Sequence, residues 1–295
     1  MGSVVNRNER LLGALLVIAS ALVFSLSGVL TKAIAADAWT IVCWRGLVGG
    51  LLVAAYVAWL GRDKPLADSF RLGWRGWLLA SVGSLASLAF IFAFKLTFVA
   101  NVAVIYATAP FMAAGLGWWL IREGFRSRTL IAAGFSLIGI GIVMAGGLGT
   151  GNILGDMVAL AMTFGNALYM ALIRLFRETP VVWAGGVSAL QLFAVGWLVV
   201  DPLAVSQQDA ALLLLFGISF AVAVVLWTEG TKLIPAAESG LLGTAETPFA
   251  ALLAWLLLTE IPPMASLIGG GMVLAAVFVH AALDASEAGT GARDA

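Results

Sequence analysis

The chain has 295 residues, of which 62% are hydrophobic and only 11% are charged. An ordinary soluble domain is about half apolar and about a quarter charged, so this composition excludes a water-soluble globular fold. The 16 basic and 16 acidic residues give a formal net charge of +0, which argues against a nucleic-acid partner, and the single cysteine, Cys43, excludes an internal disulfide framework.

Ten apolar stretches follow one another along the chain, each close to the twenty residues that a helix needs to cross a bilayer. The stretches are continuous instead of alternating, which favours helices over a closed barrel. The predicted spans are 11–31, 39–60, 76–95, 101–121, 129–147, 155–174, 181–200, 211–230, 239–258 and 264–283. The predicted fold class is therefore all-α integral membrane, with ten transmembrane helices.

The first span resembles a secretory signal in its flanks, because Arg7 and Arg10 precede it and Ala33-Ile34-Ala35 follows it. Its apolar stretch of about twenty residues exceeds the usual 7 to 15 of a signal peptide. We expect this span to be retained as a transmembrane helix.

The basic residues predict the orientation, because cytoplasmic loops carry an excess of Lys and Arg. With the N-terminus in the cytoplasm, thirteen of the sixteen basic residues fall on the cytoplasmic side. The outer loops then hold only Lys32 and Lys95, while Arg45 lies within a span. We therefore predict a multi-pass protein of the bacterial inner (plasma) membrane with both termini in the cytoplasm.

The two halves of the chain resemble each other. Gly13 to Lys32 (GALLVIASALVFSLSGVLTK) aligns without gaps on Gly155 to Arg174 (GDMVALAMTFGNALYMALIR), an offset of 142 residues. Further matches at offsets of 137 to 138 are Lys95-Leu96 with Lys232-Leu233, Pro110-Phe111 with Pro248-Phe249, and Glu123 with Glu260. Because each repeat has five spans, the second repeat is inverted relative to the first, as in alternating-access transporters.

This repeat predicts the domain organisation. A cytoplasmic N-terminus covers 1–10, the first five-helix repeat 11–147, and the second, inverted repeat 155–283. The small and polar tail at 284–295 is predicted to be disordered and cytoplasmic.

The chain resembles the drug/metabolite transporter superfamily, in particular its ten-helix EamA-type exporters. The resemblance is carried by the 5+5 layout, Arg45 early in the second span, and the paired segments PFMAAGLGWWLIRE (110–123) and PFAALLAWLLLTE (248–260), each followed by a Gly-rich span. It covers residues 10–283, and within the superfamily the chain looks most like bacterial exporters of aromatic and neutral amino acids. The resemblance implies a central cavity lined by the first, third, fourth, sixth, eighth and ninth helices.

Glu246 is the deepest acid of the predicted spans and directly precedes Thr247-Pro248. An ionisable side chain inside a membrane is costly and therefore marks a candidate site. We interpret Glu246 as a contact for a substrate amine or a protonation site, and the alternative is a neutral acid bonded to a helix loosened by proline. For Glu229, Glu238, Glu260 and Glu123, near the span ends, capping or ion pairing is favoured over gating.

Arg45 is interpreted as a gating residue about 9 Å into its span. It could form an outer ion pair with Asp156, Asp37 or Glu260, capture a substrate carboxylate, or reach the interface as a snorkelling arginine. Pro110 and Pro248 are also predicted gate elements, because a proline kink lets half a helix tilt.

Two stripes of polar and bulky side chains mark candidate cavity faces. The first span carries Ser20, Phe24, Ser27 and Thr31 on one helix face. Their counterparts at the offset of 142 are Met162, Asn166, Tyr169 and Ile173. We predict substrate binding at Ser20, Phe24, Ser27, Asn166 and Tyr169, and the alternative is polar residues that join neighbouring helices.

Aromatic and hydroxyl side chains extend this candidate site. On the third span one face carries Ser84, Ser87, Phe90 and Phe94, and Trp227 is the counterpart of Phe90 in the second repeat. On the fourth span Tyr106 and Thr108 precede Pro110, and Thr108 is the counterpart of Glu246. Ser87, Phe90, Tyr106, Thr108 and Trp227 are therefore predicted to bind substrate, although aromatic residues in membrane helices also pack or face lipid.

Catalytic and metal chemistry have little material in this sequence. His280 is the only histidine, and no phosphate-binding G-x-x-x-x-G-K-[ST] motif occurs. We expect no catalytic residue, no metal and no cofactor, with a small-molecule substrate and the lipid bilayer as the partners. Gly46-x-x-x-Gly50 and Gly271-x-x-x-Ala275 could pack helices within one chain or between two, which leaves the oligomeric state open.

The functional prediction is export of small metabolites, above all amino acids, by alternating access through a central cavity. The alternative within transport is efflux of drugs or lipophilic cations, for which Glu246 would be the counter-ion. An intramembrane enzyme or a channel would be the alternatives outside this class. Saturation of the flux at carrier-like turnover would distinguish a carrier from a channel.

Overall fold

The computed structural model describes residues 7–291, except 64, 123–126, 151, 235–238, 240 and 241. Within these residues the regular structure is entirely helical. The helices are α1 (Arg7–Ala33), α2 (Ala38–Leu60), α3 (Leu66–Ser69), α4 (Gly73–Leu96), α5 (Val99–Tyr106), α6 (Ala109–Ile121), α7 (Ser127–Thr150), α8 (Ile153–Leu175), α9 (Val181–Val199), α10 (Gln207–Leu233), α12 (Glu246–Leu258) and α13 (Met264–Gly291). Eight segments of the described chain are long and apolar enough to cross a membrane, and two shorter apolar helices accompany them.

Side-chain caps begin some of these helices where the sequence supplies them. Asp37 caps α2, because its Oδ1 accepts hydrogen bonds from the backbone N–H groups of Trp39 at 2.8 Å and Thr40 at 3.1 Å. Ser206 caps α10 by accepting from the N–H of Asp209 at 3.0 Å.

The last helix is longer than the sequence predicts. α13 continues to Gly291, so residues 284–291, for which the sequence predicts disorder, are helical.

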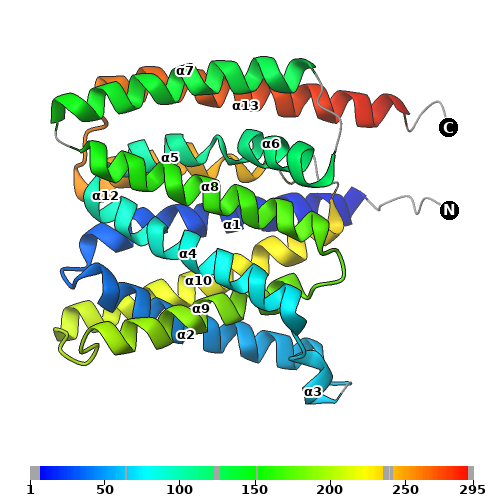
Figure 1. The fold of residues 1–295 in the computed structure, drawn as a ribbon, viewed down its shortest axis with the longest axis vertical. Coiled ribbons are helices and arrows are strands. Elements are labelled where there is room, and N and C mark those ends of the chain that lie inside the picture. The colour runs from blue at the N-terminus through cyan, green and yellow to red at the C-terminus, as the bar shows by residue number, and fades with distance from the viewer. Residues whose placement is uncertain are drawn as a thin grey trace.

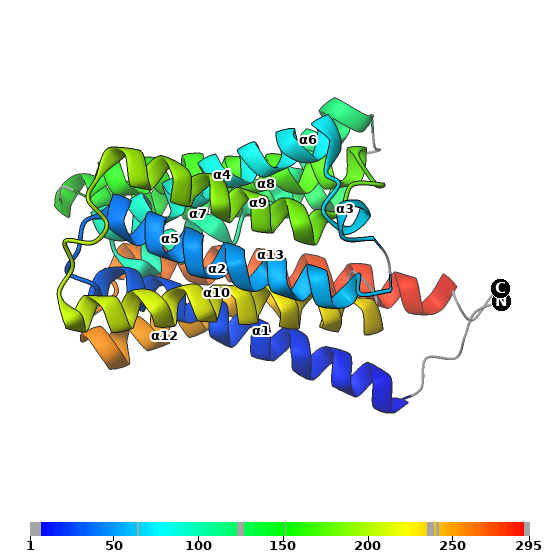
Figure 2. The ribbon, with the colours of Figure 1, turned by 90° about the horizontal axis from the view of Figure 1, so that it is seen from below.

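The helices form one elongated bundle in which the two repeats interlock (Figure 1). α7 and α13 pack along one edge, and α2 and α9 pack along the opposite edge, with the remaining long helices between them. The start of α1 and the end of α13 lie at the same end of the bundle in both views (Figure 2). We call the opposite end, where α1 and α12 finish and α5 and α8 begin, the distal end.

The helix pairing follows the internal repeat. The second helix of one repeat packs on the second of the other (α2 with α9), and the fifth packs on the fifth (α7 with α13). The first helix of each repeat packs on the third of the other, as α1 does with α10 and α8 with α4. Such reciprocal pairing is what two inverted copies of one five-helix unit produce.

Small residues allow these helices to approach closely. At Gly46 of α2 a side chain would collide with α9, because a Cβ there would lie 2.4 Å from the carbonyl oxygen of Ala189. Gly50 meets the side chain of Leu190 on the same helix. The Gly46-x-x-x-Gly50 pair therefore packs α2 against α9 within one chain. The sequence had left open whether this motif joins helices of one chain or of two.

The outer surface of the bundle is apolar. Leu85, Trp119, Leu148 and Leu198 are each more than two thirds exposed. Apolar side chains on the outside suit a hydrocarbon environment. The backbone suits it as well, because the helices satisfy their own hydrogen bonds.

Candidate functional site

A small cavity lies between α1, α4, α5 and α12, with about 10 Å³ open to the centre of a water-sized molecule. Four of the predicted substrate-binding residues line it, namely Phe24, Phe90, Tyr106 and Glu246. These side chains come from the first, third, fourth and ninth spans, whereas the sixth and eighth spans do not contribute to this lining. Other parts of the wall, among them Ser25, Phe94 and Thr247, were not among the predicted substrate-binding residues.

Glu246 is the charged group of this cavity. It is the first residue of α12, where the backbone leaves the turn formed by Thr244 and Ala245. Within the described residues no side chain donates a hydrogen bond to its carboxylate or forms an ion pair with it, whereas the next residue, Thr247, reaches the carbonyl of Ala103 at 3.4 Å. The carboxylate of Glu246 is therefore free to meet a ligand in the cavity.

The two prolines predicted as gate elements follow interruptions of the helices that carry them. α5 ends at Tyr106, α6 begins at Ala109, and Pro110 stands in the first turn of α6. Pro248 stands in the first turn of α12, two residues after Glu246. A proline in the first helical turn loses no hydrogen bond, because those N–H groups have no partner within the helix. Both fourth and ninth spans are thus broken beside the cavity, at positions related by the repeat.

Arg45 is buried away from the three acids proposed as its ion-pair partners. The residue is 6% exposed. Its guanidinium donates a hydrogen bond to Ser87 Oγ through Nη2 and lies over the rings of Phe216 at 5.4 Å and Phe220 at 4.9 Å. The Nε atom has no hydrogen-bond partner among the described residues. The ion-pair and snorkelling interpretations of Arg45 do not fit this geometry, because the head group is held inside the bundle by Ser87 and aromatic rings.

Arg45 is nevertheless close to the cavity through one shared wall. Its guanidinium carbon lies 5.9 Å from the centre of the Phe90 ring, and Phe90 lines the cavity. Phe90 also meets Phe94 edge to face, with ring centres 4.7 Å apart. Phe90 therefore contacts both the guanidinium and the cavity.

The other predicted substrate-binding residues occupy contacts between or within helices. Ser20 donates to the carbonyl of Ala223 at 2.8 Å and joins α1 to α10. Thr108 donates to the carbonyl of Ile105 at 2.7 Å at the break between α5 and α6, and the Asn166 amide donates to the carbonyl of Met162 at 3.3 Å on its own helix. None of these three side chains lines the cavity described above.

Three further predicted residues also lie outside the cavity lining. Ser27 is buried on α1, and Tyr169 packs with the cluster that joins α8 to α4. The Trp227 ring packs against Gly243, where a Cβ would lie 2.8 Å from it. Their roles in substrate binding stay predictions. Glu123 and Glu238 lie outside the described residues.

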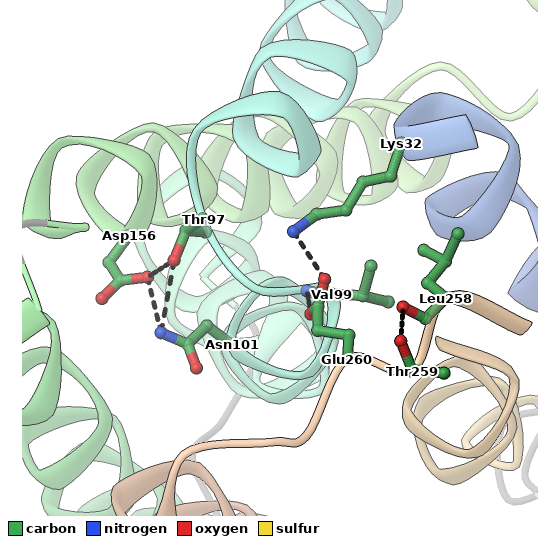
Figure 3. Close-up of polar contacts among 8 residues, drawn as sticks. All are labelled: Lys32, Thr97, Val99, Asn101, Asp156, Leu258, Thr259 and Glu260. Atoms are coloured by element: carbon green, nitrogen blue, oxygen red, sulfur yellow. Dashed lines mark hydrogen bonds and ion pairs between the residues drawn. The ribbon is translucent and has the colours of Figure 1, made fainter. Parts of the chain in front are cut away.

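The distal end of the bundle is closed by charged groups (Figure 3). Lys32 at the end of α1 pairs with Glu260 after α12, with Nζ and Oε2 2.6 Å apart and side chains that are 25% and 11% exposed. Oε1 of Glu260 accepts a hydrogen bond from the backbone N–H of Val99 at 2.5 Å, so one carboxylate ties α1, α5 and the end of α12 together. Lys95 adds bonds to the carbonyl oxygens of Ile34 at 2.6 Å and Ala36 at 3.1 Å.

This closure uses both outer lysines of the predicted topology, and the ion pairing favoured for Glu260 is present. The Lys32 partner was not predicted, although the scarcity of basic residues on that side was a usable signal.

Asp37, which caps α2, is a further acid at the distal end. Burial raises the pKa of Asp37, but hydrogen bonds from the Thr40 side chain and from the N–H groups of Thr40 and Trp39 lower this pKa by a larger amount. The pKa of Asp37 is therefore lowered overall.

The described residues contain no group of three or more His, Cys, Asp or Glu side chains that could hold a metal ion. The chemistry that the cavity offers is therefore recognition by one carboxylate, one phenol and several aromatic rings.

Comparison with known proteins identifies the architecture. A family model described as the EamA-like transporter family matches the chain twice, over residues 11–145 and 153–281. Eighteen chains of solved structures match as well, and one of them, described as "Crystal structure of protein", is 19% identical with a TM-score of 0.65, covering 92% of this chain and 96% of that chain. At that identity the likeness shows the fold alone, and no curated protein matches. The predicted fold class and the resemblance stated from the sequence are both confirmed.

Proposed function

Because the chain belongs to the EamA-like transporter family, and is thus a multi-pass membrane transporter of the drug/metabolite type, we propose that it exports amino acids with apolar or aromatic side chains. The observation that carries the proposal is the cavity in which Glu246 faces Phe24, Phe90 and Tyr106.

The composition of the cavity matches the two ends of such a substrate. The carboxylate of Glu246 accepts hydrogen bonds from an ammonium group, and charge-assisted bonds of this kind are the stronger ones. The aromatic rings offer an apolar surface and attract a cation at their faces. In this conformation the cavity has only about 10 Å³ open to a water-sized molecule, so it must widen to admit a substrate.

Arg45 supports an amino acid over a simple amine. A zwitterionic substrate needs a partner for its carboxylate, and an arginine is suited to this task because its guanidinium presents several donors in one plane. Arg45 has an Nε without a partner among the described residues and lies near the Phe90 ring, which lines the cavity. We infer that the substrate carboxylate draws Arg45 toward the cavity when Phe90 turns.

A second candidate function is efflux of lipophilic cations. The lining itself contains one acid and no basic side chain, which also suits a cation with an aromatic body. The two functions differ in whether the substrate must carry a carboxylate.

Transport would proceed by alternating access. In the proposed orientation, with both termini in the cytoplasm, the distal end faces outward, and the Lys32–Glu260 pair closes it. The interruptions before Pro110 and Pro248 would act as hinges, because interrupted helices tilt without breaking further hydrogen bonds. The proposed location is the bacterial inner membrane.

Purified protein in liposomes tests this proposal. Phenylalanine, its amide, phenethylamine and a cationic dye would be compared as substrates for counterflow, with empty liposomes as the control. Saturable uptake of phenylalanine that is stronger than that of the amide and the amine supports amino-acid export. Equal uptake of all amines, or uptake of the dye alone, supports cation efflux and overturns the proposed substrate.

A further inference from the structure

A second polar cluster lies at the distal end, apart from the cavity. It joins Asp156 of α8, Thr97 between α4 and α5, Asn101 of α5 and Ser266 of α13. Oδ1 of Asp156 accepts hydrogen bonds from the Thr97 hydroxyl at 2.7 Å and from the Asn101 amide at 2.9 Å (Figure 3). Oδ1 of Asn101 in turn accepts from the hydroxyl of Ser266. Four segments of the bundle are therefore joined by this cluster, three of them directly at Asp156.

The second oxygen of this acid has no partner. Asp156 is 0% exposed, and its Oδ2 is buried without a hydrogen bond among the described residues. Both donors in the cluster are neutral and both bond to Oδ1. Buried carboxylates are normally paired with a cation or fully hydrogen-bonded, because desolvation of an unpaired charge is costly. Half of this carboxyl group is therefore prepared for an additional occupant.

The backbone of α7 lies close to Oδ2. Gly147 of α7 stands against it, since a Cβ at that position would lie 2.2 Å from Oδ2. A metal ion would need several oxygen ligands arranged around it. A proton needs only the oxygen itself.

Asp156 stands in the first turn of α8. Gly155 lets this turn lie close to the end of α4, because any side chain there would strike the carbonyl group of Leu96.

We propose that Asp156 is a proton-binding site that couples protonation to the opening of the distal end. The step is a reversible transfer in which Oδ2 of the carboxylate binds a proton to form the neutral acid and releases it again. The proposal rests on the transporter assignment and does not depend on which substrate is carried.

The connection to the distal closure is short. Thr97 and Asn101, which bond to Asp156, flank Val99, whose N–H bonds to Glu260 of the ion pair with Lys32 (Figure 3). Loss of the proton leaves a charge that strengthens its hydrogen bonds from the start of α5. Stronger bonds at this point would shift the start of α5. That shift would reach both the closure and the cavity, because α5 also carries Tyr106.

The charged groups around this cluster are few. Lys32 and Glu260 pair with each other across α5, and Lys95 bonds to the carbonyl oxygens of Ile34 and Ala36. The nearest residues of α7 and α13 are uncharged. Asp156 is therefore the titratable group at the centre of the cluster.

An infrared experiment tests the site without any substrate. Difference spectra of the protein in lipid vesicles, recorded between high and low pH, should contain a carboxylic C=O band that is lost in Asp156→Asn and kept in Asp209→Asn. Asp209 is a matched control, since it is a buried acid at the same end whose Oδ1 accepts from the N–H of Ala35 at 2.9 Å. In Thr97→Val, which loses a bond to the charged form, the band should appear at a higher pH.

A flux experiment tests the coupling. With labelled phenylalanine as the probe, uptake driven by a pH gradient should fall about tenfold in Asp156→Asn, a typical size for coupling between two sites, while counterflow without a gradient stays close to wild type. Asp209→Asn should retain both activities.

The outcomes separate the hypotheses. A spectrum of Asp156→Asn with every wild-type band, or a band that responds to Na⁺ and not to pH, overturns the proton site. Equal gradient-driven uptake in Asp156→Asn and wild type overturns the coupling. If phenylalanine is not transported at all, the proposed substrate fails, and the infrared result still decides the proton site. If Asp156→Asn does not fold, the response of the wild-type band and its shift in Thr97→Val decide instead.

Discussion

The replacement Glu246→Gln isolates the charge of the proposed substrate site. Gln has nearly the same shape and still accepts a hydrogen bond, so the cavity between Phe24, Phe90 and Tyr106 should keep its form. No described side chain bonds to Glu246, so its replacement leaves no protein donor unpaired. The expected loss is the charge-assisted part of one hydrogen bond, about 1 to 2 kcal/mol. Since about 1.4 kcal/mol is a factor of ten, affinity for an amine-bearing substrate should fall by about 5 to 30 times.

Counterflow in liposomes measures this loss as a rise in the half-saturating concentration of phenylalanine. Glu229→Gln is the matched control, because that acid contacts Tyr56 and Lys232 and does not line the cavity. Its half-saturating concentration should equal that of the wild type. If Glu246→Gln transports with wild-type affinity while it inserts and melts normally, the carboxylate does not meet the substrate and the site assignment fails.

Three further predictions concern the ends of the bundle. Lys32→Gln should remove about 1 kcal/mol of closure and raise amide hydrogen exchange at residues 97–101 about fivefold, whereas unchanged exchange would show that the pair does not hold this end. Asp37→Ala should lower stability in detergent by about 1 kcal/mol at neutral pH. Because the folded pKa of Asp37 is lowered, that difference is present above the unfolded pKa of about 3.9 and should disappear as the pH falls from there through the lower folded pKa, which melting curves would reveal. In a background without the native cysteine, Leu203→Cys should react with an impermeant thiol reagent from outside and Asp63→Cys should not; the reverse pattern refutes the orientation.

The positions of the helices were predictable because the bilayer dictates their length. The predicted span 39–60 corresponds to α2 (Ala38–Leu60), and 181–200 corresponds to α9 (Val181–Val199). The proline at 110 signalled a disturbance of the fourth span, but the sequence does not distinguish a kink from the complete break between α5 and α6. That choice depends on which neighbours satisfy the freed backbone groups.

The composition of the cavity was only partly predictable for a different reason. In a membrane both the protein interior and the lipid are apolar, so helical spacing identifies residues that share a face but not what the face meets. Ser20 and Phe24 share such a face, yet Ser20 bonds to α10 while Phe24 lines the cavity. The Lys32–Glu260 pair was hidden as well, because its members are 228 residues apart and only the folded chain brings them together.

The two repeats carry different residues at the positions of two acids. Inverted repeats present nearly equivalent surfaces to both sides of the membrane, so the helices alone do not favour one direction of transport. Glu246 corresponds to Thr108 in the first repeat, and at the offset of 142 Asp156 corresponds to Ala14. Both acids belong to the second repeat, one at the cavity and one at the distal end. In the transport cycle proposed above, binding of a cation or a proton at these acids would stabilise one of the two inverted states more than the other, which is the condition for a directional response to a gradient.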